Sequence, residues 1–438
     1  MIKLIYLLLI KGLIFFLLNQ AIGLLNYNLD WVSLLIIFLN SLAFIFVLVK
    51  DAKNKKEYLI LLLAYIFRIL LMLWDIYGRE IFILPNSGND SEAFHYHALA
   101  FSSGLGSGRG GMYSTVVGII YSVFGPQRIV AQYFNVLLGM YSIITINKIM
   151  NFLKINSRIQ TRLLIFVSFM PTLAILSSIL KRESIITALV TVSLLYFLKW
   201  IRTGKLNSFL FAIFLPVVAA TFHSGAVAMT LAYMVYFIIY DPKKNTYDFS
   251  VKTFMALTCF IGLFFLVNHT LGEFIFGKFD IYDTMEDVIA NAGRRARGGS
   301  AYLVNMQATG LGSMIIYTPI RMFYFLFSPF PWDWRGINDI LSFFTNSIIY
   351  ILAVYYAIKS LKIKNKSHNE LVALLIITTI TVMMFAWGVS NTGTAMRHRS
   401  KYIAIYMITL GISLEQLNES KITKVEQAVS ISLEQSEN

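Results

Sequence analysis

The stretch WVSLLIIFLNSLAFIFVLVKDAKNKKEYLILLLAYIFRILLMLWDI (residues 31–76) decides the fold, because two long apolar segments flank one short basic segment. Each apolar segment has about the 17–25 residues that a helix needs to cross the hydrocarbon core of a bilayer. Over 438 residues, 57% of the side chains are hydrophobic and only 14% are charged, against about 25% charged in a typical soluble domain. The sequence therefore predicts an all-α protein, a polytopic transmembrane helical bundle.

Apolar segments of this kind recur along the chain, and they predict about 12 membrane spans with both termini in the cytoplasm. The predicted spans are 4–25, 31–49, 58–76, 128–147, 162–180, 184–201, 207–221, 225–240, 252–270, 341–359, 370–388 and 400–415. The layout rests on four basic segments, DAKNKKE, NKIMNFLKINSRIQTR, DPKKN and KSLKIKNK, which all fall on one side. Lys and Arg collect in cytoplasmic loops, so this side is predicted to be cytoplasmic.

The same layout predicts one transmembrane domain over residues 1–415 and a polar cytoplasmic tail over 416–438. Two long outer loops are expected, at about 77–127 and 271–340. Each contains an apolar segment, 113–124 or 313–330, that is too short or too polar to cross the membrane. We expect both segments to form juxtamembrane or re-entrant helices on the outer face.

The net charge of +14 does not require a nucleic-acid partner, because loop topology and anionic lipids explain a basic balance in a membrane protein. The single cysteine, Cys259, excludes a disulfide framework and a thiolate metal site.

The first outer loop contains the run SGNDSEAFHYH, in which acids and histidines are closely spaced. A general base must lie within hydrogen-bond distance of the hydroxyl that it deprotonates, so Asp90, Glu92 and His95 are catalytic candidates. Asp90 could instead cap a helix. A metal site formed by Asp90, His95 and His97 is a weaker alternative, because the sequence offers no second cluster of ligands.

Cationic clusters occur in outer segments, where the topology rule does not expect them, and this favours an anionic ligand. The candidate binding residues are Lys181 and Arg182 in LKRES, Arg294, Arg295 and Arg297 in GRRARGGS, and Arg397, His398, Arg399 and Lys401 in MRHRSK. His223, in TFHSGA, is a further catalytic candidate. The alternative interpretation is that these cations reach lipid headgroups or lie in solvated loops.

These features together fit a lipid-linked diphosphate donor. Arginines suit recognition of phosphate oxygens and stabilisation of a departing diphosphate. A carboxylate or imidazole would accept the proton, and Trp332 and Trp334 in PFPWDWR could anchor the membrane interface or stack on sugar rings.

The stretch GMYSTVVGIIYSVFGPQRIVAQYFNVLLGMYSIITINKI resembles bacterial polytopic glycosyltransferases of the GT-C type. The later elements LKRES, TFHSGA, RMFYFLFSPFPWDW and SNTGTAMRHRSKY are similar to motifs of oligosaccharide repeat-unit polymerases from surface-polysaccharide loci. The resemblance spans about residues 85–405. It implies a GT-C-like fold, an undecaprenyl-diphosphate-linked sugar substrate on the outer face of the bacterial inner membrane, and Asp90 as the catalytic acid position.

We therefore expect an enzyme that polymerises lipid-linked repeat units of an O-antigen or capsule. The alternatives are a GT-C-type transferase of one sugar from a polyprenyl-phosphate donor, a flippase or transporter of lipid-linked oligosaccharide, and a membrane O-acyltransferase. The expected partners are the lipid-linked oligosaccharide, the bilayer and a chain-length regulator or other polysaccharide-assembly proteins. No cofactor is expected, and a divalent metal has no support in the sequence.

Overall fold

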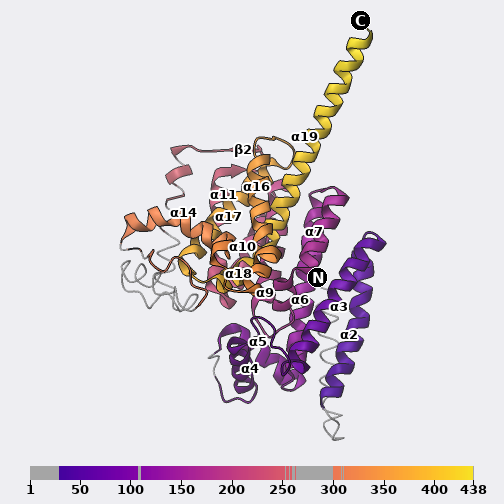
Figure 1. Cartoon of the computed structure of the whole chain (residues 1–438), viewed down its shortest axis with the longest axis vertical. Coiled ribbons are helices and arrows are strands. Elements are labelled where there is room, and N and C mark those ends of the chain that lie inside the picture. The colour runs from indigo at the N-terminus through magenta and orange to yellow at the C-terminus, as the bar shows by residue number, and fades with distance from the viewer. Residues whose placement is uncertain are drawn as a thin grey trace. The chain divides into compact units, whose positions relative to one another are not determined.

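The computed structural model of the chain is almost entirely helical, as the sequence predicts (Figure 1). The structure describes residues 29–106, 110–251, 253–255, 257–258, 262, 299–306, 308 and 310–437. Within these residues the only paired strands are β1 (Tyr240–Asp241) and β2 (Thr246–Tyr247), which form one short antiparallel hairpin. The all-α prediction is confirmed.

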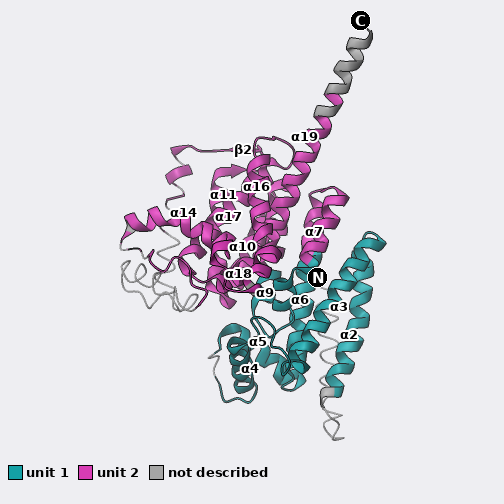
Figure 2. Ribbon diagram, in the orientation of Figure 1, with its two compact units in different colours: residues 1–144, 168–188 teal, residues 145–167, 189–438 magenta. Residues whose placement is uncertain are grey.

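The chain divides into two compact units (Figure 2). Unit 1 comprises residues 1–144 and 168–188, and unit 2 comprises residues 145–167 and 189–438. Helices α6 (Arg128–Phe152), α7 (Ser157–Phe169) and α9 (Glu183–Thr203) each contribute residues to both units.

Unit 1 is built on a pair of membrane-length helices and a pair of short ones. Its further elements are α2 (Leu29–Asp51), α3 (Lys55–Tyr77), α4 (Asn89–Ser102), α5 (Gly111–Phe124) and α8 (Pro171–Leu176). Helix α3 begins after Asn54, whose side chain accepts a hydrogen bond from the backbone N–H of Glu57 at 2.9 Å. Arg68 is fully buried in α3 and donates to the Ser177 hydroxyl at 3.0 Å and the Ser168 carbonyl at 2.7 Å. These bonds attach α3 to the segment around α8.

Unit 2 has an aromatic core between α9, α10 (Leu206–Phe222) and α11 (Val227–Ile239). In this core Phe197 stacks on Tyr233, with 4.0 Å between the ring centroids. Trp200 packs beside this pair and is also buried. The further elements are η1 (Ser224–Ala226), α14 (Leu311–Phe327), η2 (Pro331–Asp333), α15 (Ile337–Ser342), the π-helix η3 (Phe343–Ser347), α16 (Ile348–Ser360), α17 (His368–Gly388), α18 (Thr392–Ser400) and α19 (Ile403–Glu437).

Six helices in the described residues are long and apolar enough to cross a membrane, which supports an integral membrane protein. They are Trp31–Asp51, Lys55–Tyr77, Arg128–Phe152, Glu183–Thr203, Asp339–Ser360 and His368–Gly388. Each matches a predicted span. The predicted spans 207–221 and 225–240 form shorter apolar helices, while 4–25 and most of 252–270 lie outside the described residues. The short helices expected at 113–124 and 313–330 are present as α5 and α14, and their position relative to a membrane stays a prediction.

One predicted span is interrupted in the structure, and the helix of another continues beyond the predicted end of the span. The predicted span 162–180 is not one helix, because α7 ends at Phe169 and Pro171 starts the six-residue α8. Proline lacks the backbone N–H that would continue the preceding helix. The helix of the last predicted span does not end at residue 415, since α19 runs without a break from Ile403 to Glu437 (Figure 1). No Gly or Pro interrupts residues 412–437, so the helix continues.

Candidate functional site

The first polar cluster lies in unit 1, at the start of α4. Gly88 occupies the N-cap position of this helix, and Asp90 lies in its first turn. The Asp90 carboxylate accepts a hydrogen bond from the Lys181 ammonium at 2.7 Å. The Asp90 side chain is 56% exposed and the Lys181 side chain only 2%. A buried cation is therefore held against a carboxylate that solvent can reach.

A buried asparagine fixes the turn that carries Lys181. The Asn135 amide, on α6, donates to the carbonyls of Ile179 at 2.8 Å and Lys181 at 3.0 Å. It also donates to the Tyr113 hydroxyl of α5 at 2.8 Å. The main chain around Lys181 is consequently held by α6, independently of Asp90.

Glu92 accepts hydrogen bonds from two arginines that the sequence analysis did not single out, Arg79 and Arg128. The Arg128 contact measures 2.7 Å, and the other edge of this guanidinium lies 3.5 Å from the fully buried Asp75. Burial alone would raise the pKa of Glu92, but the hydrogen bonds and charges of Arg128 and Arg79 lower it below its ordinary value. Glu92 is therefore ionised at neutral pH.

His95 lies one turn further along α4 and forms a 2.7 Å hydrogen bond through Nδ1 with the Tyr121 hydroxyl of α5. Burial lowers the pKa of His95 below 6.5, and the charge of Arg128 lowers it further against the opposing effect of Glu92. The imidazole is therefore neutral at pH 7. His97 stands apart from this contact and packs on the Tyr96 ring. No group of three potential metal ligands occurs in the part of the chain that the structure describes.

Arg182 completes this group, with its guanidinium 5.9 Å from the centroid of the Phe94 ring on α4. We call Arg79, Asp90, Glu92, His95, Arg128, Lys181 and Arg182 the α4 cluster. Helices α4 and α5 pack against each other within unit 1 (Figure 2). The contacts of the cluster bring together the end of α3, the start of α6 and the turn before α9. It thus lies at one end of three membrane-length helices.

The second polar cluster lies in unit 2 and consists of His223, His398 and Lys401, which we call the histidine cluster. The two imidazole rings are 4.7 Å apart between centroids. His223 Nδ1 accepts from the Gly225 N–H at 3.1 Å, and His398 Nδ1 accepts from the Lys401 ammonium at 3.2 Å. Each neutral ring therefore carries its proton on Nε2, which makes that nitrogen a donor.

Close packing at Gly225 holds these rings in place. A Cβ atom at this position would lie 2.6 Å from the Phe385 ring and 3.0 Å from the His223 ring. Phe385, on α17, lies beside both imidazoles, and the Tyr402 hydroxyl donates to the Gly225 carbonyl at 3.2 Å. The motifs TFHSGA and MRHRSKY therefore meet at this glycine.

Gly225→Ala should destabilise unit 2 by about 1–3 kcal/mol, the usual cost of overfilling a packed core. The thermal unfolding midpoint of the purified protein in detergent measures this. Gly393→Ala is the matched control, because its Cβ would meet only Asn391 Oδ1 at an ordinary 3.5 Å. If Gly225→Ala unfolds at the wild-type temperature, this account of the packing is incorrect.

Two arginines in unit 2 bind the protein's own main chain. Arg399, on α18, is buried and donates to the carbonyls of Leu326 and Ser328. Arg321, on α14, is also buried and donates to the Met306 carbonyl at 2.7 Å. Arg397 is only half-buried on the same helix as Arg399. Neighbouring cations of one motif therefore have different surroundings.

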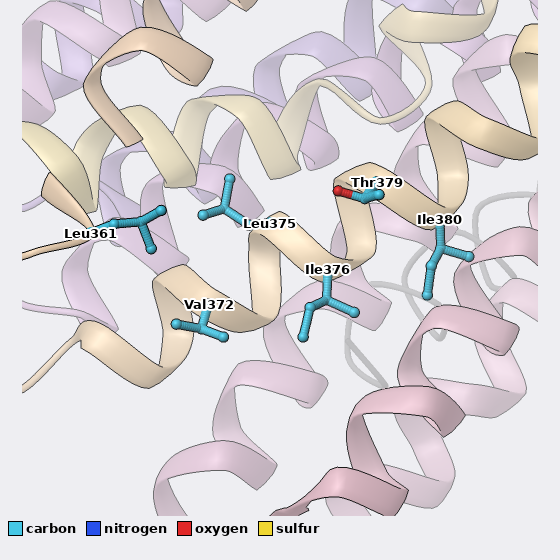
Figure 3. Close-up of a pocket in the computed structure, with 6 residues that line it drawn as sticks. All are labelled: Leu361, Val372, Leu375, Ile376, Thr379 and Ile380. Carbon is cyan, nitrogen blue, oxygen red and sulfur yellow. The ribbon is translucent and has the colours of Figure 1, made fainter. Parts of the chain in front are cut away.

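Three predicted ligands, Arg294, Arg295 and Arg297, lie outside the described residues. The Trp332 ring is exposed and stacks on Phe330 at 4.6 Å, which suits either an interfacial or a sugar-stacking role. An apolar groove of about 250 Å³ lies along α17, and its lining is aliphatic apart from Thr379 (Figure 3). With a single hydroxyl and no charged group in its lining, this groove offers nothing for acid–base chemistry.

The structure thus places ten predicted site residues in two groups. Asp90, Glu92, His95, Lys181 and Arg182 belong to the α4 cluster, and His223, Arg397, His398, Arg399 and Lys401 lie on the segments that form the histidine cluster. Arg79, Arg128 and Asp75 were not predicted from the sequence. Only their positions could have indicated them, since each lies at or next to the end of an apolar helix that borders the predicted first outer loop. No protein-family model, curated protein or solved structure matches this chain.

Proposed function

We propose that the protein polymerises undecaprenyl-diphosphate-linked oligosaccharide repeat units on the outer face of a bacterial inner membrane. The observation that carries this proposal is the α4 cluster, in which accessible carboxylates and a neutral imidazole lie beside preorganised cations. The cluster lies at the ends of membrane-length helices. If these helices cross the membrane, this is the level at which the diphosphate of a membrane lipid would lie. The starts of α6 and α9 add positive helix dipoles there.

In the proposed reaction the carboxylate acts as the base, and the cations stabilise the leaving group. Asp90 accepts the proton of the attacking hydroxyl on the acceptor sugar, as a general base. That oxygen forms the new bond to the anomeric carbon of the donor sugar, while the bond from this carbon to the diphosphate oxygen breaks. Lys181 and Arg182 stabilise the polyprenyl diphosphate that leaves with the bonding electron pair.

The half-buried His223 and Arg397 carry N–H groups, which suit sugar hydroxyls and phosphate oxygens, and we assign both to substrate binding in unit 2. His398 and Lys401 are buried, and we assign them to positioning of the His223 ring. Arg399 acts as a positioning residue, because its N–H groups are used by backbone carbonyls.

Deletion of the gene tests the proposal, with surface polysaccharide separated on a gel. If the protein is a polymerase, the deletion strain should lose the ladder of long polysaccharide chains and keep only the product with a single repeat unit. A ladder of normal length that lacks one sugar would instead identify a single-sugar transferase. Accumulation of lipid-linked units on the cytoplasmic face would identify a flippase, and either result would refute polymerisation.

Arg182→Ala, introduced into the deletion strain, should reduce ladder formation by about 10²–10³-fold, as for loss of one preorganised donor to a leaving group. Arg158→Ala is the matched control, because it removes an exposed arginine remote in sequence from either cluster. Membrane fractionation and immunoblotting must show equal amounts of both variants. A wild-type ladder from Arg182→Ala would remove this residue from the mechanism.

A further inference from the structure

The carboxylates around the α4 cluster fall into two classes. Asp75 has no exposed side-chain surface, and Glu183 is also buried. The Asp90 and Glu92 side chains are 56% and 50% exposed, although the cations that they bind are mostly buried. The buried acids belong to the core, whereas the exposed acids can move into solvent without opening it.

We propose that Arg79, Arg128 and Lys181 form a diphosphate-binding clamp, which Glu92 and Asp90 occupy in the ligand-free protein and from which the diphosphate displaces them. This inference rests on the proposed function and names the ligand of the same site. It gives Glu92 the role of an internal anion and not of a catalytic base.

Charge balance supports this exchange. A diphosphate esterified at both ends carries two negative charges, the same as the two carboxylates that it replaces. Removing a charge from water is unfavourable unless a counter-charge is present. Arg128 and Lys181, with side chains 15% and 2% exposed, therefore need an anion at all times. When no substrate is bound, the exposed carboxylates of Glu92 and Asp90 supply this anion.

The clamp keeps its shape when the carboxylates leave, because other contacts hold each cation. Arg79 donates to the Ser87 carbonyl at 2.7 Å. Arg128 lies against the buried Asp75, which itself accepts from Gln132 at 2.6 Å. Asn135 fixes the main chain of Lys181. Only α4, which carries Asp90 and Glu92, has to adjust.

The exchange also prepares the general base. In the structure the Asp90 carboxylate accepts a hydrogen bond from the Lys181 ammonium, so it is already engaged by a cation. When the diphosphate takes over Lys181, the Asp90 carboxylate is released towards the acceptor hydroxyl. Binding of the donor therefore activates the residue that deprotonates the acceptor.

Binding of inorganic pyrophosphate to the purified full-length protein in detergent, measured by calorimetry, tests the clamp. Glu92→Gln removes the internal anion and keeps its shape, so it should bind pyrophosphate about tenfold more tightly than wild type. Arg79→Ala should bind about tenfold more weakly than wild type. Glu80→Gln is the matched control, because Glu80 is an adjacent exposed acid with no ion pair within the described residues, and its affinity should not change.

The inference is overturned if Glu92→Gln binds no more tightly than wild type, or if Glu80→Gln gains as much affinity. It is also overturned if Arg79→Ala and Arg128→Ala, both shown to be folded by thermal unfolding, bind pyrophosphate like wild type. These results are separate from the gel assay. If the pyrophosphate results contradict the clamp while Arg182→Ala abolishes the ladder, the clamp is refuted and the proposed polymerisation stands. If the pyrophosphate results support the clamp while the deletion strain keeps a normal ladder, the protein binds diphosphate but catalyses another reaction.

Discussion

Asp90→Asn is expected to reduce polymer synthesis by about 10²–10⁴-fold, the usual contribution of a general base, while the protein remains folded. Asparagine keeps an oxygen that can accept the Lys181 hydrogen bond, and the position is more than half exposed, so no cavity forms. An amide cannot take the proton of the acceptor hydroxyl. The measurement is the rate of ladder formation from lipid-linked units by purified protein, together with the thermal unfolding midpoint.

Glu80→Gln serves again as the control for loss of one exposed negative charge near the α4 cluster. A wild-type rate from Asp90→Asn would contradict the assignment of the base. The neighbouring candidate would then be His95, because its lowered pKa leaves a neutral imidazole that can accept a proton at pH 7. His95→Gln would in that case cause the loss that Asp90→Asn does not.

Sequence reasoning could predict the type of fold and the types of residue at the site, because both depend on local composition. Apolar runs of membrane length identify helices without knowledge of their neighbours, and the six membrane-length helices of the described residues all match predicted spans. Lys181 and Arg182 were singled out because cations in segments predicted to lie outside violate the topology rule. Asp90 was singled out for a different reason, as one of the few acids in an apolar chain and close to two histidines.

Pairings could not be predicted, because they depend on which helix ends meet. Glu92 and Arg128 are 36 positions apart, and His223 and Gly225 meet a segment 177 positions further on through Tyr402. Nothing in either motif indicates its partner. In the sequence, Arg79 and Arg128 look like ordinary cations that flank apolar segments. Only the structure shows that Glu92 forms an ion pair with both of them.

The direction of a side chain was also beyond sequence reasoning. Arg397 and Arg399 are two residues apart on a helix, which places them about 200° apart around its axis. The sequence shows that they point differently but not which one faces the core. The structure shows that Arg399 is buried and Arg397 half-buried. A motif that looks like one cationic cluster in the sequence therefore has one arginine in the core and another that solvent can reach.

Arg399→Ala should lower the free energy of unfolding by about 1–3 kcal/mol, because it removes the Arg399 donor from the buried Leu326 carbonyl. The Ser328 carbonyl also loses Arg399 but keeps the Ser347 hydroxyl as a donor at 2.7 Å. The substitution also removes the guanidinium that lies 5.0 Å from the centroid of the Tyr350 ring. Arg399→Lys keeps the charge but loses the planar fork that reaches two carbonyls at once, so it should recover only part of the loss. Thermal unfolding of the purified variants in detergent measures both effects.

Arg397→Ala is the informative comparison, since it removes the same group from the same helix at a half-buried position. We expect it to unfold within a few degrees of wild type and yet to lose ladder formation, whereas Arg399→Ala loses both because the fold around α14 and α18 loosens. The opposite result would reverse these roles. If Arg399→Ala were as stable as wild type but inactive, its guanidinium would be a ligand for substrate, and the carbonyls of Leu326 and Ser328 would hold it only until the substrate arrives.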